Sequence, residues 1–125
     1  MSVGNCYYCN AELNYIHPEG NRYKRHKRFG VWDHVLPSCL GGNKVPKEIN
    51  LVLSCDECNE KKNGKHPLKW FFENKGFGWK KVKKKEYLYR IKVAVLIVGG
   101  FQEYPGWAAL DNHIPKFAKE LQLEQ

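Results

Sequence analysis

The fold of this chain is decided by the stretch NLVLSCDECNEKKN, which occupies residues 50–63. Its first part predicts a strand over Asn50–Leu53. The part that follows predicts a short helix over Asp56–Asn63, because acidic residues open it, lysines close it and a glycine comes directly after it. The stretch therefore predicts a strand that runs through the cysteine pair Cys55 and Cys58 into a helix.

Further elements are predicted on both sides of this stretch. Residues 29–36 are rich in β-branched and aromatic side chains and precede a proline, so we expect a strand over Phe29–Leu36 that pairs with the first. The connection over Pro37–Ile49 is too long for a tight hairpin and predicts a wide loop. Downstream, we expect one helix from Pro67 to before Gly76. Another helix is expected through Tyr87–Val98, with a strand over Val93–Val98 as the alternative.

The chain contains five cysteines, and four of them form two Cys-x-x-Cys pairs, Cys6/Cys9 and Cys55/Cys58. In a reducing compartment this pattern favours a metal over disulfides. Four thiolates are typical of a closed, tetrahedral structural zinc site. The fifth cysteine, Cys39, is expected to be a small buried thiol, with an additional metal ligand as the alternative.

The chain is basic, with 125 residues, 21 lysines and arginines, 13 acidic residues and a formal net charge of +8. This length suits one compact domain, and 42% hydrophobic residues exclude a disordered basic tail. A phosphate backbone is the expected partner of its two basic clusters, with a solvated surface as the alternative. The clusters consist of Arg22, Lys24, Arg25, Lys27 and Arg28, and of Lys80, Lys81, Lys83, Lys84, Lys85, Arg90 and Lys92.

The sequence contains no stretch typical of a membrane anchor or a secretory signal. The longest aliphatic run, Val93–Val98, is far short of the ~20 residues that cross a bilayer. The first residues lack both the charged and the apolar segments of a signal peptide. We therefore expect an intracellular protein, either cytoplasmic or phage-encoded in a host cell.

The order of polar residues around the two strands and the helix resembles the HNH nuclease family. Asp33-His34 ends the first strand, Asn50 begins the second, and Asn59 lies in the helix directly after the second cysteine pair. The resemblance covers about residues 6–65, and it implies the ββα-metal fold of that family. A metal-dependent endonuclease that hydrolyses phosphodiester bonds in DNA is the function it implies.

The resemblance also implies a division of the chain. We expect an α+β fold in which residues 1–76 form an HNH nuclease core with structural zinc knuckles. Residues 77–125 are expected to form a mainly helical C-terminal extension packed on that core, in a single compact domain. Its last part, from Pro105 to Leu123, predicts one or two short helices.

The resemblance assigns a role to each residue of the motif. Asp33 would be a ligand of the catalytic metal, and His34 would be the general base, a task that suits an imidazole with a pKa of ~6.5. Asn50 would brace the loop between the strands. Asn59 stands where the family accepts His or Asn, so the motif is an H-N-N variant. Asn63 lies on the same helical face and is either a further ligand or an exposed residue at the helix end.

The types of ligand predict the metals. Oxygen donors from Asp33, Asn59 and Asn63 favour Mg²⁺ or Mn²⁺ at the catalytic site, in addition to the structural zinc. Family chemistry implies products with 3′-hydroxyl and 5′-phosphate ends. One active site cuts one strand, so a double-strand break would need a homodimer, a second binding event or a partner.

Two other functions fit parts of the sequence. A noncatalytic zinc-ribbon module that binds nucleic acid would share the cysteine pairs but would not need Asp33, His34, Asn50 and Asn59 in this order. An RNA-processing or toxin-like nuclease would also use basic clusters, because these bind either polymer.

Lys61, Lys62 and Lys65 are expected either to contact phosphates beside the cut or to balance the helix dipole.

Overall fold

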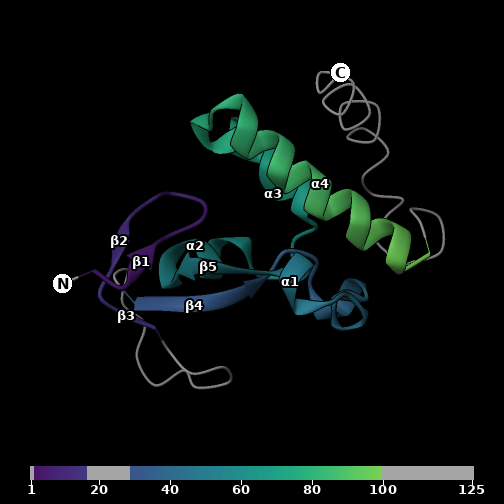
Figure 1. Cartoon of the computed structure of the whole chain (residues 1–125), viewed down its shortest axis with the longest axis horizontal. Helices are drawn as coiled ribbons and strands as arrows, with labels where there is room; N and C mark the ends of the chain where they lie inside the picture. The colour runs from purple at the N-terminus through teal and green to yellow at the C-terminus, as the bar shows by residue number, and fades with distance from the viewer. Residues whose placement is uncertain (1, 17–28, 100–125) are drawn as a thin grey trace. The chain divides into compact units, whose positions relative to one another are not determined.

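The computed structural model describes residues 2–16 and 29–99 of the chain (Figure 1). These residues form two compact units, each built from two separate stretches of sequence. Within the described residues, the first unit combines residues 2–16 and 29–34 with 51–63, and the second combines 35–50 with 64–99. The architecture is mixed α+β, as expected, whereas the division into residues 1–76 and 77–125 remains a prediction.

The first unit contains five short strands and one helix among the described residues. β1 pairs with β2 in an antiparallel manner, β3 pairs with β4 in parallel, and β4 pairs with β5 antiparallel. The helix α2 follows β5 directly and contacts both β4 and β5 (Figure 1). The bounds are β1 Gly4–Asn5, β2 Glu12–Leu13, β3 Tyr15–Ile16, β4 Phe29–His34, β5 Leu51–Cys55 and α2 Asp56–Lys62.

The pairing of β4 with β5 confirms the two predicted strands and their partnership. The ladder runs from Gly30 opposite Cys55 to His34 opposite Leu51. Because side chains alternate between the faces of a strand, Asp33 lies on one face and its neighbours Trp32 and His34 lie on the other. Asp33 is buried, whereas Trp32 is 45% exposed, so the two faces of this hairpin are very different.

Both strands differ from their predicted bounds at the end next to the loop. β4 ends at His34 rather than Leu36, because the amide of Leu36 donates to the side chain of Asn50 at 2.7 Å. β5 begins at Leu51 rather than Asn50, because Asn50 is the last residue of the helix α1 Lys47–Asn50. At Leu36, a hydrogen bond to the side chain of Asn50 thus takes the place of a backbone hydrogen bond between the strands.

The predicted wide loop between the strands belongs to the second unit and contains helical turns. It includes η1 Ser38–Leu40, η2 Gly42–Lys44 and α1. Gly42 is required there, because a Cβ at this position would lie 1.7 Å from the carbonyl oxygen of Leu36. The chain therefore folds back closely on itself in this loop.

Three further helical segments complete the second unit among the described residues, namely α3 Pro67–Glu73, η3 Lys75–Gly78 and α4 Lys81–Ile97. Proline opens α3, as predicted, and Leu68 and Phe71 are buried. The predicted helix is confirmed over Tyr87–Ile97, so the alternative of a strand over Val93–Val98 is wrong; the helix already begins within the lysine cluster.

The predicted burial of Cys39 is wrong, because this thiol is exposed in η1. Among residues 2–16 and 29–99, no helix is long and apolar enough to cross a membrane. The basic cluster Arg22–Arg28 and the predicted helices of Pro105–Leu123 lie outside the described residues.

Candidate functional site

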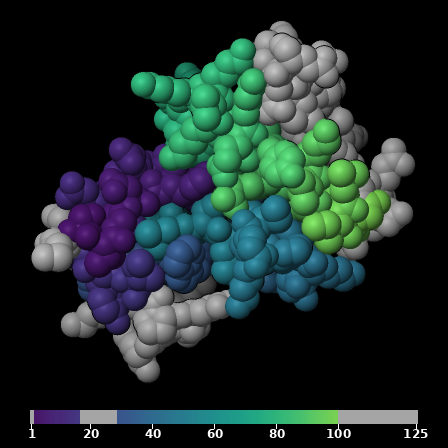
Figure 2. Space-filling view, viewed as in Figure 1, coloured from purple at the N-terminus to yellow at the C-terminus, as the bar shows by residue number. Residues whose placement is uncertain are grey.

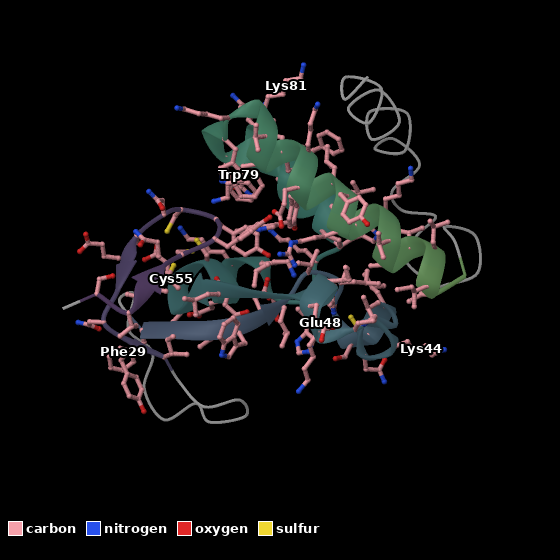
Figure 3. The ribbon with its side chains drawn as sticks, viewed as in Figure 1. Phe29, Lys44, Glu48, Cys55, Trp79 and Lys81 are labelled. Atoms are coloured by element: carbon pink, nitrogen blue, oxygen red, sulfur yellow. The ribbon has the colours of Figure 1, made fainter. Side chains whose placement is uncertain are left out.

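The four cysteines of the two Cys-x-x-Cys pairs meet at one point of the first unit. Their sulfur atoms all lie within 4.8 Å of one another, and the sulfur atoms of Cys9 and Cys55 are 3.7 Å apart. Tetrahedral zinc with Zn–S bonds of about 2.3 Å places its sulfur ligands about 3.8 Å apart. The cluster, Cys6, Cys9, Cys55 and Cys58, is thus positioned to hold a metal ion and fits structural zinc; Figure 3 shows sulfur atoms gathered beside Cys55.

Both halves of the cluster are built in the same way. The amide of Cys9 donates to the sulfur of Cys6 at 3.5 Å, and the amide of Cys58 donates to the sulfur of Cys55 at 3.3 Å. The second bond also caps the start of α2. In the first half, Asn10 closes the turn with a positive φ of 63°, a conformation that asparagine tolerates. Local backbone geometry therefore holds each pair of sulfurs side by side.

The thiols of the cluster perturb one another. Hydrogen bonds from Cys55 and Cys58 lower the pKa of Cys6, whereas the side-chain hydrogen bond with Cys55, followed by that with Cys6 and by burial, raises the pKa of Cys58. Four thiolates at this separation repel one another strongly unless a cation lies among them. The donor set and its electrostatics both match a bound divalent ion.

Asp33, the expected ligand of a catalytic metal, takes part in a buried ion pair. Its Oδ2 atom accepts a hydrogen bond of 2.6 Å from the hydroxyl of Tyr8 and lies 3.4 Å from the ammonium of Lys62. Burial raises the pKa of Asp33, while Lys62 and Tyr8 act in the opposite direction. Among the described residues, Oδ1 makes no hydrogen bond, so one carboxylate oxygen is available to another ligand.

His34 and Asn59 lie near the same end of the first unit. The backbone carbonyl of His34 accepts a hydrogen bond of 2.8 Å from Lys62, and its side chain is half-buried on the face opposite Asp33. Asn59 is half-buried and lies one turn before Lys62 in α2, so both residues share the helix face that contacts β4. The structure thus brings Asp33, His34 and Asn59 into one unit.

The two remaining asparagines of the motif lie at the end of α2 and in the loop between β4 and β5. Asn63 is exposed at the C-cap of α2, where its backbone N–H donates to the backbone carbonyl of Asn59 at 2.9 Å. Asn50 belongs to the second unit and is 1% exposed. Its amide group donates to the carbonyls of Leu36 and Gly42, both at 3.1 Å, so it braces the loop that precedes it.

The lysines near the motif are not equivalent. Lys61 is exposed and pairs with Glu57 within α2, and Lys65 pairs with Glu73 in the second unit. Lys62 is completely buried, so the expectation that it contacts phosphate at the surface is wrong. Its ammonium instead reaches Asp33 and the carbonyl of His34.

Sequence reasoning did not find the partners of Asp33. Tyr8 lies inside the first cysteine pair and was hidden by the metal motif around it, and Lys62 looked like one of several helix-end lysines. A signal was nevertheless present for Lys62, because it follows Asn59 by three residues and so lies on the same helix face.

Comparison with protein families, with curated proteins and with solved structures finds no match to this chain.

Proposed function

We propose that this chain is a metal-dependent endonuclease of the HNH type that hydrolyses phosphodiester bonds in DNA. The observation that supports this most is the arrangement of Asp33 and His34 at the end of a strand that α2 contacts. That helix carries Asn59 and begins inside the cysteine cluster. The sequence motif and the ββα order of elements thus occur together.

The proposed chemistry divides the tasks between the residues of the first unit. His34 would take a proton from the attacking water as general base. Oδ1 of Asp33 and the side-chain oxygen of Asn59, with Asn63 as a further candidate, would hold Mg²⁺ or Mn²⁺, since hard cations prefer oxygen ligands. When bound, such an ion supplies charge neutralisation at the phosphate and at the leaving 3′ oxygen. Zinc would be structural only.

DNA is the proposed substrate because positive charge is concentrated where phosphate is easily bound. The first turn of α4 lies within the lysine cluster and contains no acidic residue that would offset this charge. Lysines at a helix N-terminus add to the positive end of the helix dipole instead of balancing it. Side chains at the start of α4 project from the surface in Figure 2, and Figure 3 shows Lys81 pointing outward. Such a surface favours a polyanion.

The decisive experiment is cleavage of supercoiled plasmid with Mg²⁺, with Mn²⁺ and with EDTA. We expect nicking or linearisation that needs a divalent ion and is lost in His34→Ala, while plasmid binding persists because phosphate contacts are untouched. His17→Ala is the matched control, since His17 has no place in the motif. Cleavage that persists in His34→Ala would contradict the proposed base, and matched RNA would test the choice of polymer.

A noncatalytic zinc-ribbon module that binds nucleic acid is the second candidate. The buried ion pair of Asp33 with Lys62 favours it, because a carboxylate engaged in this way also fits a purely structural role. Plasmid binding by the wild type without cleavage under any metal condition would support this module.

A further inference from the structure

Lys62 is unusual because it is completely buried at the C-terminal end of α2. A buried ammonium is unfavourable unless hydrogen-bonding partners and an opposite charge compensate for lost water. Lys62 has both, since it donates to the carbonyl oxygen of His34 at 2.8 Å and lies 3.4 Å from Oδ2 of Asp33. One side chain therefore contacts both members of the Asp33-His34 pair.

The carboxylate of Asp33 is held a second time by Tyr8. The hydroxyl of Tyr8 donates to the same oxygen, Oδ2, at 2.6 Å, and the ring of Tyr8 is buried. A hydrogen bond and an ion pair at the same oxygen restrict the rotation of the carboxylate, and Oδ1 makes no hydrogen bond among residues 2–16 and 29–99.

Both donors come from segments that the cysteine cluster fixes. Tyr8 lies between Cys6 and Cys9, and Lys62 lies one helical turn after Cys58 in α2. An ion in the cluster would therefore hold both anchors of Asp33 at once. The two cysteine pairs approach Asp33 through different elements, so displacement of either half would move one donor.

We propose that Lys62 and Tyr8 are positioning residues for the Asp33-His34 pair, and that the metal-loaded cysteine cluster sets the orientation of this pair through them. Lys62 fixes the peptide plane of His34 and thereby the direction of its side chain, while Tyr8 and Lys62 together fix the carboxylate of Asp33. The assignment of the reaction to His34 rests on the proposed function, whereas the positioning itself does not.

A purely structural ion pair is the competing interpretation, and it predicts a different result. Such a pair would change stability alone and would leave the environment of the His34 ring unchanged in any variant that folds. A positioning role predicts a changed ring environment in a folded, zinc-loaded variant, because the backbone carbonyl of His34 has lost its donor.

The test compares the full-length wild type with Lys62→Met, which keeps the length of the side chain and removes the charge. Zinc content, the nitrogen and carbon NMR resonances of the His34 ring, and plasmid cleavage at varied DNA concentration are measured. The His34 resonances are assigned by their loss in His34→Ala. We expect unchanged zinc content, shifted ring resonances and a fall in kcat of about 100-fold with KM nearly constant.

Lys61→Met is the matched control, because Lys61 is the preceding residue and its side chain is 67% exposed. It should leave zinc content and the His34 resonances unchanged. If Lys62→Met does not fold, Tyr8→Phe decides, since it removes only one hydroxyl; we expect a fall in kcat of about tenfold together with a change at the His34 ring.

The outcomes separate the two proposals. Unchanged His34 resonances and unchanged kcat in a folded Lys62→Met or Tyr8→Phe would overturn the positioning role and leave the proposed nuclease intact. Shifted His34 resonances in folded Lys62→Met or Tyr8→Phe, together with a wild type that never cleaves DNA, would support the positioning role and overturn the nuclease.

Discussion

The first unit contains a partly buried cysteine cluster and a buried ion pair, whereas the second unit contains a cluster of packed aromatic rings. In the first, the fully or almost fully buried side chains include the polar Asp33, Ser54 and Lys62. In the second, the ring of Phe71 stacks on Tyr87 with centroids 5.9 Å apart, and Trp79 packs edge-on against Tyr87 at 5.3 Å. Both units bury aliphatic side chains, but the first adds an ion pair and a thiol cluster, and the second adds packed aromatic rings.

This difference predicts which unit depends on a metal. Thiolates close together need a cation among them, and a buried ion pair adds little net stability. Packed aromatic rings stabilise a core without any added charge. The second unit also binds its own loop, because Arg90 of α4 donates to the carbonyl of Ile49 in α1 at 2.7 Å. We therefore expect the first unit to require zinc and the second to remain folded without it.

Replacement of a metal ligand should have the largest effect. We expect Cys55→Ser to lose zinc and unfold the first unit, because structural zinc contributes about 10–16 kcal/mol to folding in small domains. The amide NMR signals of the first unit, such as that of Asp33, should move to the shifts of an unfolded chain. The signals around Tyr87 in the second unit should keep their chemical-shift dispersion.

Cys39→Ser is the control for this prediction, since Cys39 is exposed and is not part of the cluster. It should bind zinc like the wild type. Loss of the Tyr87 signals in Cys55→Ser would contradict the independence of the second unit, and retention of cleavage without zinc would contradict the structural role of the metal.

The buried ion pair should have the next largest effect. Lys62→Met and Asp33→Asn should each lower the free energy of unfolding by about 3–5 kcal/mol, because each leaves one buried charge without its partner. The double variant should lose clearly less than the sum, since it removes both charges together. Urea denaturation in the presence of zinc measures all three, and Lys61→Met should stay within about 0.5 kcal/mol of the wild type.

The next prediction concerns Asn50, a buried polar residue of the second unit. Asn50→Ala should lower the free energy of unfolding by about 3 kcal/mol, because it removes three buried hydrogen bonds to Leu36 and Gly42. Thermal unfolding gives the value, and the exposed Asn43→Ala should change it by less than about 0.5 kcal/mol. Equal effects of the two variants would show that Asn50 does not brace the loop.

The smallest expected effect lies in the turn that precedes α4. Lys75 and Phe77 adopt positive φ values of 51° and 57°, a conformation that favours glycine. Lys75→Gly should therefore stabilise the second unit by up to about 1 kcal/mol. Lys85→Gly, within α4, should destabilise it by a similar amount. Differential scanning calorimetry decides, and the same sign for both variants would exclude strain at Lys75.

Local chemistry explains which parts of the structure were predictable. The cysteine spacing predicts the cluster, and the capping and dipole preferences of residues 56–63 predict α2, because these signals act over a few residues. Proline likewise marks the start of α3. The partnership of β4 and β5 follows from their β-branched and aromatic composition.

Tertiary interactions explain the rest. The early end of β4 results from the side chain of Asn50, and the burial of Lys62 results from Asp33, which lies far away in sequence. The exposure of Cys39 follows from its place in a short helical turn at the surface, although its residue type favours burial. A single sequence does not encode such long-range pairs in any periodic pattern.

The ladder between β4 and β5 gives the metal cluster one more consequence. A shift of this pairing by a single residue would turn Val52 and Ser54, now buried, to the open face. Cys55 would leave its place opposite Gly30 and would no longer meet Cys6 and Cys9. Only the native alignment therefore completes the set of four sulfurs, so an ion that needs all four ligands would bind and stabilise only correctly aligned hairpins.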